Sequence, residues 1–97
     1  MAVGDVVSVV PTSVNAAASL TIQPSSTAEW VIHNLYYGAA VEVYFTDGSH
    51  PIKIDSDASL GGRFGAVFHV TATAYLTLKN VSAGAAYYAY DGVITHA

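Results

Sequence analysis

The feature that most constrains the fold is a series of short runs rich in Val, Ile, Thr, Tyr and Phe, separated by Gly, Asn, Asp, Pro or Ser. Such runs are typical of β-strands joined by turns. No stretch combines apolar residues at the i, i+3, i+4, i+7 spacing of an amphipathic helix with good helix formers between them. The chain is therefore predicted to be all-β.

The number and spacing of these runs predict the architecture. The predicted strands are Val3–Val10, Ser19–Gln23, Ala28–Tyr37, Ala40–Thr46, His50–Asp55, Arg63–Val70, Ala74–Asn80 and Ala85–Thr95. Eight short strands in a chain of 97 residues predict an eight-stranded antiparallel β-sandwich, most naturally jelly-roll-like. An immunoglobulin-like sandwich is the alternative, although the chain has no cysteine pair. The last strand is long enough to bend or break at Gly92.

The clearest local element is a hairpin around Asp47-Gly48. Apolar and polar residues alternate on both sides of this pair, over Val41–Thr46 and over Ile52–Ile54. Asp-Gly is the preferred pair for a type I′ turn, because both central residues of that turn need positive φ. Alternation with period 2 predicts that one face of the hairpin lies in the core.

The N-terminal segment differs from the rest of the chain. A β-branched run ends at Pro11, and small residues follow from Thr12 to Ser19. We expect an N-terminal strand or arm with a small-residue linker over residues 1–18 and a sandwich body over residues 19–97, within a single domain. A terminal strand on such a linker can pair within its own chain, or reach a neighbour by strand addition or swapping.

Low charge is the main clue to function. Charged residues make up 10% of the chain, against roughly 25% in an ordinary domain. Either a neutral polar surface keeps the protein in solution, or one face is covered in an oligomer or a larger assembly. The only cations are Lys53, Arg63 and Lys79, too few to bind nucleic acid or an anionic membrane. No apolar run approaches the length that spans a bilayer, and we see no export signal.

The residues that usually carry catalysis or metal binding do not form a recognisable motif. The histidines at 33, 50, 69 and 96 have no close ligand spacing, and no G-x-S-x-G elbow or carboxylate pair stands out. Asp55-Ser56-Asp57 offers oxygen atoms to Ca²⁺, but a loop with Asx-turns explains it as well. Asn80-Val81-Ser82 matches the glycosylation triplet, which we interpret as chance. We expect no enzyme activity, no metal and no cofactor.

Tyrosine is abundant, with seven in the chain, and it supplies the candidate contact residues. In Tyr36-Tyr37 and in Tyr87-Tyr88 the two side chains point to opposite faces, so we expect one of each pair in the core. An exposed Tyr suits an assembly contact or a glycan site, and is also found on ordinary surfaces. The candidate interaction residues are Val3, Val6, Val7, Val9, Tyr37, Tyr44 and Tyr87.

Residues 20–95 also resemble a known class of proteins. The stretches that carry the resemblance are Thr21–Pro24, Glu29–Tyr36, Val41–Tyr44 with Asp47-Gly48, Tyr75–Asn80 and Tyr90–Val93. The chain resembles small virion proteins of tailed bacteriophages, above all capsid decoration (cement) proteins.

The resemblance implies a non-enzymatic structural protein on the capsid exterior, made in the host cytoplasm. Its partner would be the major capsid protein, and it would stabilise the phage head as a homo-oligomer, with a trimer favoured. The alternative is a carbohydrate- or receptor-binding sandwich module of a phage tail or fibre. The aromatic platform of such a module would be Trp30 or Tyr87.

Overall fold

The structure is a computed structural model that describes residues 2–97, and over this range it contains nine β-strands and no helix. The strands are β1 (Val6–Val14), β2 (Ser19–Ile22), β3 (Glu29–Tyr37), β4 (Val41–Thr46), β5 (Ile52–Asp57), β6 (Gly61–Arg63), β7 (Phe68–Thr71), β8 (Tyr75–Asn80) and β9 (Ala86–His96). The predicted all-β class is confirmed.

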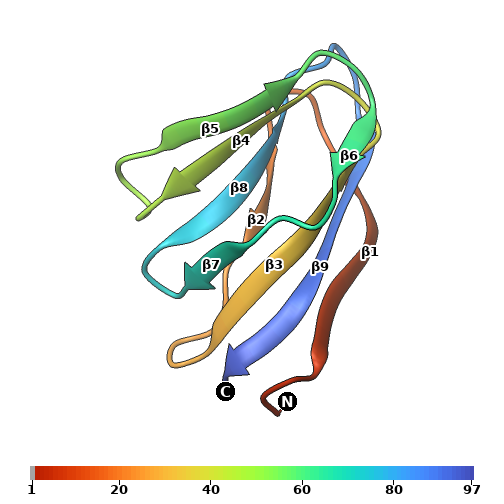
Figure 1. The fold of residues 1–97 in the computed structure, drawn as a ribbon. Helices are drawn as coiled ribbons and strands as arrows, with labels where there is room; N and C mark the ends of the chain where they lie inside the picture. The colour runs from red at the N-terminus through yellow and green to blue at the C-terminus, as the bar shows by residue number, and fades with distance from the viewer. Residues whose placement is uncertain (1) are drawn as a thin grey trace.

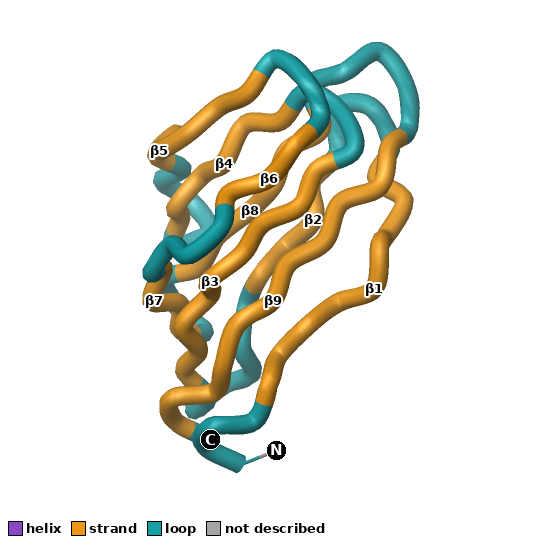
Figure 2. Tube along the Cα trace, turned by 45° about the vertical axis from the view of Figure 1, so that its right-hand side comes forward, coloured by secondary structure: helices purple, strands orange, loops and turns teal. Residues whose placement is uncertain are grey.

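The strands form two antiparallel sheets packed face to face, as Figure 1 shows. One sheet has five strands in the order β1-β9-β3-β6, with β7 also paired to β3. The other has four strands in the order β2-β8-β4-β5. The predicted antiparallel sandwich is therefore confirmed, and Figure 2 shows both layers from the side of β1.

Alternating burial explains how this sequence builds a sandwich. In β8, Leu76 and Leu78 are fully buried, whereas Thr77 and Lys79 between them are partly exposed. Each such Leu or Ile contributes about 1.5–3 kcal/mol when it is removed from water. The core between the sheets consists of Val14, Ile22, Ile32, Leu35, Tyr37, Val41, Val43, Val70, Leu76, Leu78 and Tyr88. One face of each sheet is thus committed to the core, and the outer faces remain available for function.

The predicted strand Arg63–Val70 is wrong, because two short strands replace it. β6 pairs with the C-terminal part of β3 and β7 with the N-terminal part of β3. Between them Gly65 has a φ of 68°, in the left-handed region that interrupts an extended strand. Residues 2–97 therefore contain nine strands rather than the eight predicted.

The turn type predicted for Asp47-Gly48 is also wrong. Gly48 has a positive φ of 99°, but Asp47 does not, so the type I′ geometry is absent. Instead the Asp47 carboxylate accepts hydrogen bonds from the backbone N–H groups of Ser49 and His50, at 2.8 and 2.9 Å. The hairpin itself is present, since β4 and β5 are paired and antiparallel.

Two expectations about neighbouring segments need correction. β1 continues through Pro11 to Val14, because a register shift between Val9 and Thr12 places the proline in a bulge on the sheet edge. The segment between β1 and β2 is therefore shorter than the predicted linker. In this structure β1 pairs with β9 of its own chain, and Val7 and Val14 are buried.

Candidate interaction surface

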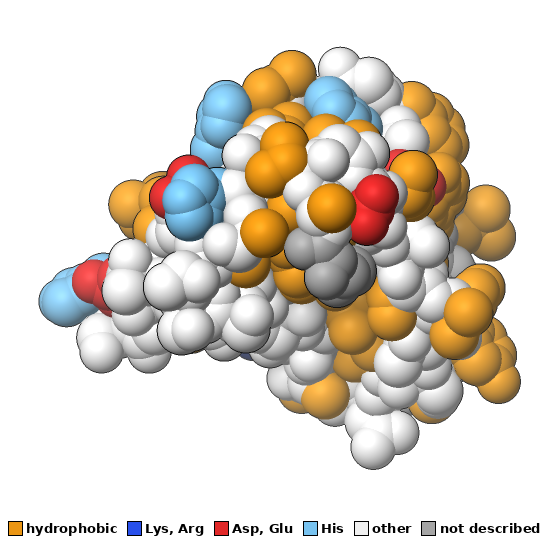
Figure 3. All heavy atoms as spheres, turned by 90° about the horizontal axis from the view of Figure 1, so that it is seen from below, with side chains coloured by type: hydrophobic (Ala, Val, Ile, Leu, Met, Phe, Trp, Pro, Cys, Tyr) orange, Lys and Arg blue, Asp and Glu red, His pale blue; other side chains and the backbone are white. Residues whose placement is uncertain are grey.

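The outer face of the five-stranded sheet carries a group of exposed apolar side chains, which we call the apolar face. It consists of Val6, Val10, Tyr36, Phe64 and Tyr87. Val6, Val10, Phe64 and Tyr87 are each more than 60% exposed, at 69%, 76%, 69% and 63%. Figure 3 views the molecule from the end where the termini lie, and hydrophobic side chains gather on its right-hand side, the side of β1.

Strand periodicity places these side chains outside. Val6 and Tyr36 are followed by the buried residues Val7 and Tyr37, so they point away from the core. Tyr87 likewise precedes the buried Tyr88. The prediction that each adjacent tyrosine pair divides between core and surface is confirmed.

A hydrogen-bond network fixes the centre of the apolar face. The Asp91 carboxylate accepts from Asn34 Nδ2 at 2.6 Å and from the Tyr36 hydroxyl at 2.7 Å. The bond to Asp91 raises the pKa of the Tyr36 phenol, because deprotonation would place two negative charges together. The one carboxylate at the centre of this face is therefore held by neutral donors.

The same network positions Phe64. Asn34 Oδ1 accepts from the Gly65 backbone N–H at 3.1 Å, and His33 Nδ1 lies 2.9 Å from the Ala66 carbonyl oxygen. These contacts tie the segment after β6 to β3. The Phe64 and Tyr36 rings then lie 5.7 Å apart, tilted by 57°. This is a favourable aromatic geometry, which leaves the exposed part of the Phe64 ring in a defined position.

Positive charge is kept away from the apolar face. All three cations of the chain are on or directed toward the four-stranded sheet: Lys53 on β5, Lys79 on β8, and Arg63 paired with Asp55 of β5. Within residues 2–97 the apolar face therefore has no Lys or Arg among its residues. Depletion of charge with enrichment of Tyr and Phe is typical of the core of a protein–protein interface.

The structure separates the predicted contact residues into two groups. Val3, Val6 and Tyr87 are exposed, while Val9 and Tyr44 are partly exposed. Val7 and Tyr37 were the wrong choices, because they are 6% and 4% exposed and belong to the core. The sequence did indicate that Tyr37 is buried, since Tyr37 and Leu35 are two residues apart on one strand and therefore point to the same face.

Three residues of the apolar face were missed. Val10 was predicted within the N-terminal strand but not as a contact. Tyr37, and not Tyr36, was chosen as the candidate contact of that pair. Phe64 was expected inside a regular strand, where its exposure could not be foreseen. Only the break between β6 and β7 turns this side chain outward.

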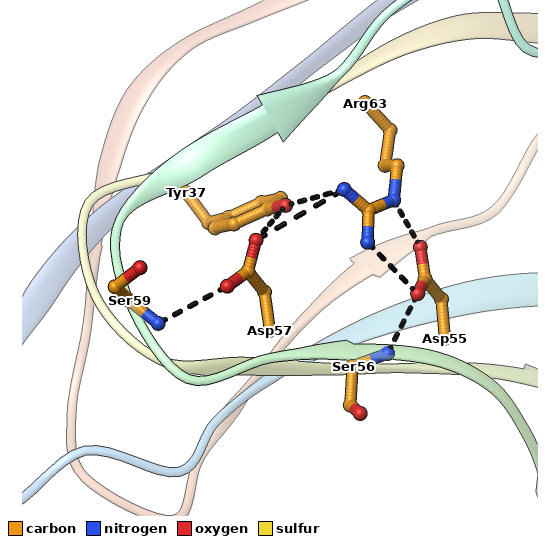
Figure 4. A network of polar contacts seen from close by, with 6 residues as sticks. All are labelled: Tyr37, Asp55, Ser56, Asp57, Ser59 and Arg63. Carbon is orange, nitrogen blue, oxygen red and sulfur yellow. Dashed lines mark hydrogen bonds and ion pairs between the residues drawn. The ribbon is translucent and has the colours of Figure 1, made fainter.

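A polar cluster closes the opposite edge of the sandwich, and we call it the Asp55–Arg63 clasp (Figure 4). Arg63 binds Asp55 through two bonds, from Nε at 2.5 Å and from Nη2 at 3.1 Å. The Tyr37 hydroxyl donates to Asp57 at 2.8 Å and accepts from Arg63 Nη1 at 3.3 Å. These bonds connect β5 of one sheet with β6 and β3 of the other.

The clasp shows how Asp55 and Asp57, which the sequence offered as oxygen ligands only as an alternative, are used in the fold. The Arg63 hydrogen bond lowers the pKa of Asp55, and the Tyr37 hydroxyl lowers the pKa of Asp57. Both residues lie in strand β5 rather than in the loop that was the other interpretation. Their oxygen atoms are directed to Arg63 and Tyr37, so the two carboxylates stabilise contacts within the fold.

Asn80, the first residue of the predicted glycosylation triplet, is fully buried. Its amide nitrogen donates to the carbonyl oxygens of Val14 at 2.8 Å and Gly84 at 2.9 Å. Its side-chain oxygen accepts from the Ser82 N–H and hydroxyl. The Asn80 side chain is therefore a structural link between β1, β8 and the turn before β9.

Over residues 2–97 no three His, Cys, Asp or Glu side chains are placed to hold a metal ion together. The same residues contain no helix that could span a membrane. No protein-family model matches the chain, and no curated protein matches it.

Proposed function

We propose that the protein is a non-enzymatic structural component of a virion, a decoration protein on the exterior of a phage head. In this proposal the apolar face makes the contacts, both between copies of the chain and with the major capsid protein. The observation that carries the proposal is the ordered, cation-free group of exposed apolar side chains on the five-stranded sheet. The resemblance of residues 20–95 to phage decoration proteins supports the choice of partner.

The chemistry of the apolar face supports an interface. Single exposed apolar residues are ordinary, but several on one sheet, with Tyr36 and Phe64 in contact among them, favour an interaction site. Tyr36 and Phe64 are aromatic anchors held in place before any partner arrives, so little side-chain entropy is lost on binding. The low overall charge is consistent with a surface that is partly covered in the assembled state.

The strand order also supports the proposal. If β6 and β7 count as one interrupted strand, eight strands are divided between the two sheets in the orders β1-β9-β3-β6 and β2-β8-β4-β5. We take this arrangement to be a jelly roll, an architecture that recurs in viral capsid and lectin domains. Fold alone does not assign function, so the apolar face carries the argument.

The test is co-sedimentation with capsid shells of the encoding phage, prepared without this protein. We expect saturable binding of the natural chain. A variant with Val6→Ser, Phe64→Ser and Tyr87→Ser should bind at least about tenfold more weakly, because interface anchors of this type each contribute 1 kcal/mol or more.

The matched control replaces apolar side chains that are equally exposed but lie on β5. Ile52→Ser with Ile54→Ser should leave binding unchanged, since Ile52 is 61% exposed and remote from the apolar face. Equal binding by the apolar-face variant and the natural chain would refute the proposed contact surface. Absence of the natural chain from the sedimented shells would refute the function.

A further inference from the structure

The outer face of the four-stranded sheet has a different chemistry, set by strand register. Tyr44 on β4 lies opposite Thr77 on β8 and Lys53 on β5. Glu42, two residues earlier on the same face, lies opposite Lys79. We call these five residues the Tyr44 face. They point outward because Val41 and Val43, which alternate with them on β4, are buried.

The Tyr44 ring lies along its strand. Its hydroxyl donates to Glu42 Oε1 at 2.5 Å, and Glu42 is two positions back on the same side of β4. Side chains at such positions are about 6.5–7 Å apart, so the ring must lean over the sheet to reach the carboxylate. Lys53 Nζ holds the other oxygen of Glu42 at 3.6 Å. The Tyr44 ring is thus a platform fixed in advance, with one broad side toward the solvent.

A shallow depression adjoins this platform. Its walls are Ala17, Ser19, Pro51, Thr77 and Lys79, together with Tyr44 itself. The depression therefore combines an aromatic ring and two apolar walls with two hydroxyl groups and an amine. A pyranose ring needs the same elements, because its C–H side packs on an aromatic ring while its hydroxyls take hydrogen bonds.

Charge selects among saccharides. Lys53 and Lys79 against Glu42 leave the Tyr44 face with one net positive charge, in a chain whose net charge is −4. The third cation, Arg63, is bound by Asp55 in the clasp. Among residues 2–97 no carboxylate lies within 4 Å of the Lys79 amine. Lys79 lies opposite Glu42 but forms no ion pair with it, so the Lys79 amine has donors available for an anionic group on a ligand in the depression.

We propose that the Tyr44 face binds an acidic saccharide, a sugar ring that carries a carboxylate, as in a hexuronate unit. The ring packs on Tyr44, and the carboxylate pairs with Lys79. Ser19 and Thr77 contact the sugar hydroxyls. The site lies on the sheet opposite to the apolar face, so it does not depend on the proposed attachment and stays open when that face is covered.

The experiment is an NMR titration of the ¹⁵N-labelled full chain with tetragalacturonate at low ionic strength. We expect saturable shifts at amides of β4 and β8 around Tyr44, Thr77 and Lys79. Tyr44→Ala should weaken binding about tenfold through loss of the platform. Lys79→Gln should weaken binding about threefold, because it removes the attraction between the amine and the sugar carboxylate. Added salt should weaken binding to the natural chain in the same way, because it screens that attraction.

Three controls separate a saccharide site from general attraction. Tyr87→Ala removes an exposed tyrosine of the apolar face and should leave the titration unchanged. Tetragalactose tests the ring without the carboxylate, and polyglutamate tests the carboxylate without the ring; both should bind more weakly than tetragalacturonate. If Tyr44→Ala fails to fold, the change Lys79→Gln at a partly exposed position and the two control ligands still decide the question.

Two results would overturn the proposal. One is the absence of saturable shifts with tetragalacturonate at millimolar concentration. The other is equal binding of polyglutamate together with no effect of Tyr44→Ala, which would mean charge attraction alone. Neither result bears on attachment through the apolar face, which is measured separately by co-sedimentation.

Discussion

Gly92 lies within β9 where this strand passes closest to β3. A Cβ at this position would collide with the Val31 carbonyl oxygen and lie 2.7 Å from Ile32 Cα, both backbone atoms that cannot move aside. A register shift between Ile32 and Asn34 shows that β3 already bulges here. Strand β9 is therefore not broken at Gly92, which was one of the two possibilities that the sequence suggested, and Gly92 allows a close approach of two backbones.

Gly92→Ala should destabilise the fold by about 3 kcal/mol, the upper part of the range for overpacking. Urea unfolding followed by Trp30 fluorescence measures this change. The control is Gly84→Ala, because no atom lies within 4 Å of a Cβ built at Gly84 and its φ is not positive. That control should stay within about 0.5 kcal/mol of the natural chain. Equal unfolding midpoints for the two variants would contradict the close approach.

Asn80 has a similar role among the polar residues. Asn80→Ala should destabilise the fold by about 2 kcal/mol, since it leaves the buried carbonyl group of Val14 without its donor and removes a second bond to the Gly84 carbonyl. This corresponds to a fall of roughly 8–16 °C in the melting temperature of a domain this small. Calorimetry measures it.

Ser82→Ala is the comparison for Asn80, because it removes one hydroxyl from the same network and keeps the Asn80 amide. We expect a smaller fall in melting temperature for Ser82→Ala than for Asn80→Ala. The reverse order would show that the turn, and not the buried amide, stabilises this region.

At the scale of elements, the free edges of the two sheets are joined on one side by the Asp55–Arg63 clasp. β5 is the last strand of its sheet and has few apolar neighbours, so Ile52 and Ile54 are 61% and 43% exposed. The contact of β5 with the other sheet is therefore made by Asp55 and Asp57, which bind Arg63 and Tyr37, rather than by these isoleucines. The predicted inward face of the hairpin is correct for Val41 and Val43 but not for these isoleucines.

The clasp predicts a pH dependence of stability. The folded-state pKa values of Asp55 and Asp57 are below their ordinary values, so the folded state binds fewer protons than the unfolded state in this range. The stabilisation is complete above the unfolded pKa of about 3.9 and is lost as the pH falls through the lower folded values. Arg63→Gln should be less stable than the natural chain at pH 7, and this difference should shrink as the pH falls below about 4.

Urea midpoints between about pH 7 and pH 2 test this prediction. Lys53→Gln serves as the control, since it removes a cation paired with Glu42 on the exposed outer face. Its difference from the natural chain should be small at all pH values, as is usual for an exposed ion pair. A constant difference for Arg63→Gln across the pH range would mean that Arg63 acts through packing alone.

At the scale of the whole molecule, the two outer faces are chemically distinct. One is apolar and without cations, and the other carries Lys53 and Lys79 among hydroxyl groups. This division lets one side contact an assembly while the other faces the solvent. Two of the three cations, Lys53 and Lys79, lie on the face that we expect to remain exposed.

We expect the purified protein to form a closed oligomer, with a mass by light scattering of three 10.1 kDa chains. The variant with Val6→Ser, Phe64→Ser and Tyr87→Ser should shift toward the mass of one chain, because it removes the apolar contacts that drive association. The Ile52→Ser and Ile54→Ser variant should keep the natural mass. A single-chain mass for the natural protein at high concentration would contradict the oligomeric part of the proposal.

The sequence by itself determined the all-β class and the approximate places of most strands, because period-2 alternation and turn residues are local properties of the chain. It determined that Tyr36 and Tyr37 lie on opposite faces, and likewise Tyr87 and Tyr88. The strand face that Tyr37 shares with Leu35 indicated its buried position, but for Tyr87 and Tyr88 only the tertiary structure decided which side chain is outside, since that choice depends on the face that packs against the other sheet. The break at Gly65 that exposes Phe64, and the pairing of Arg63 with Asp55, also required the folded chain. They arise from contacts between separate strands, whose register no local pattern specifies.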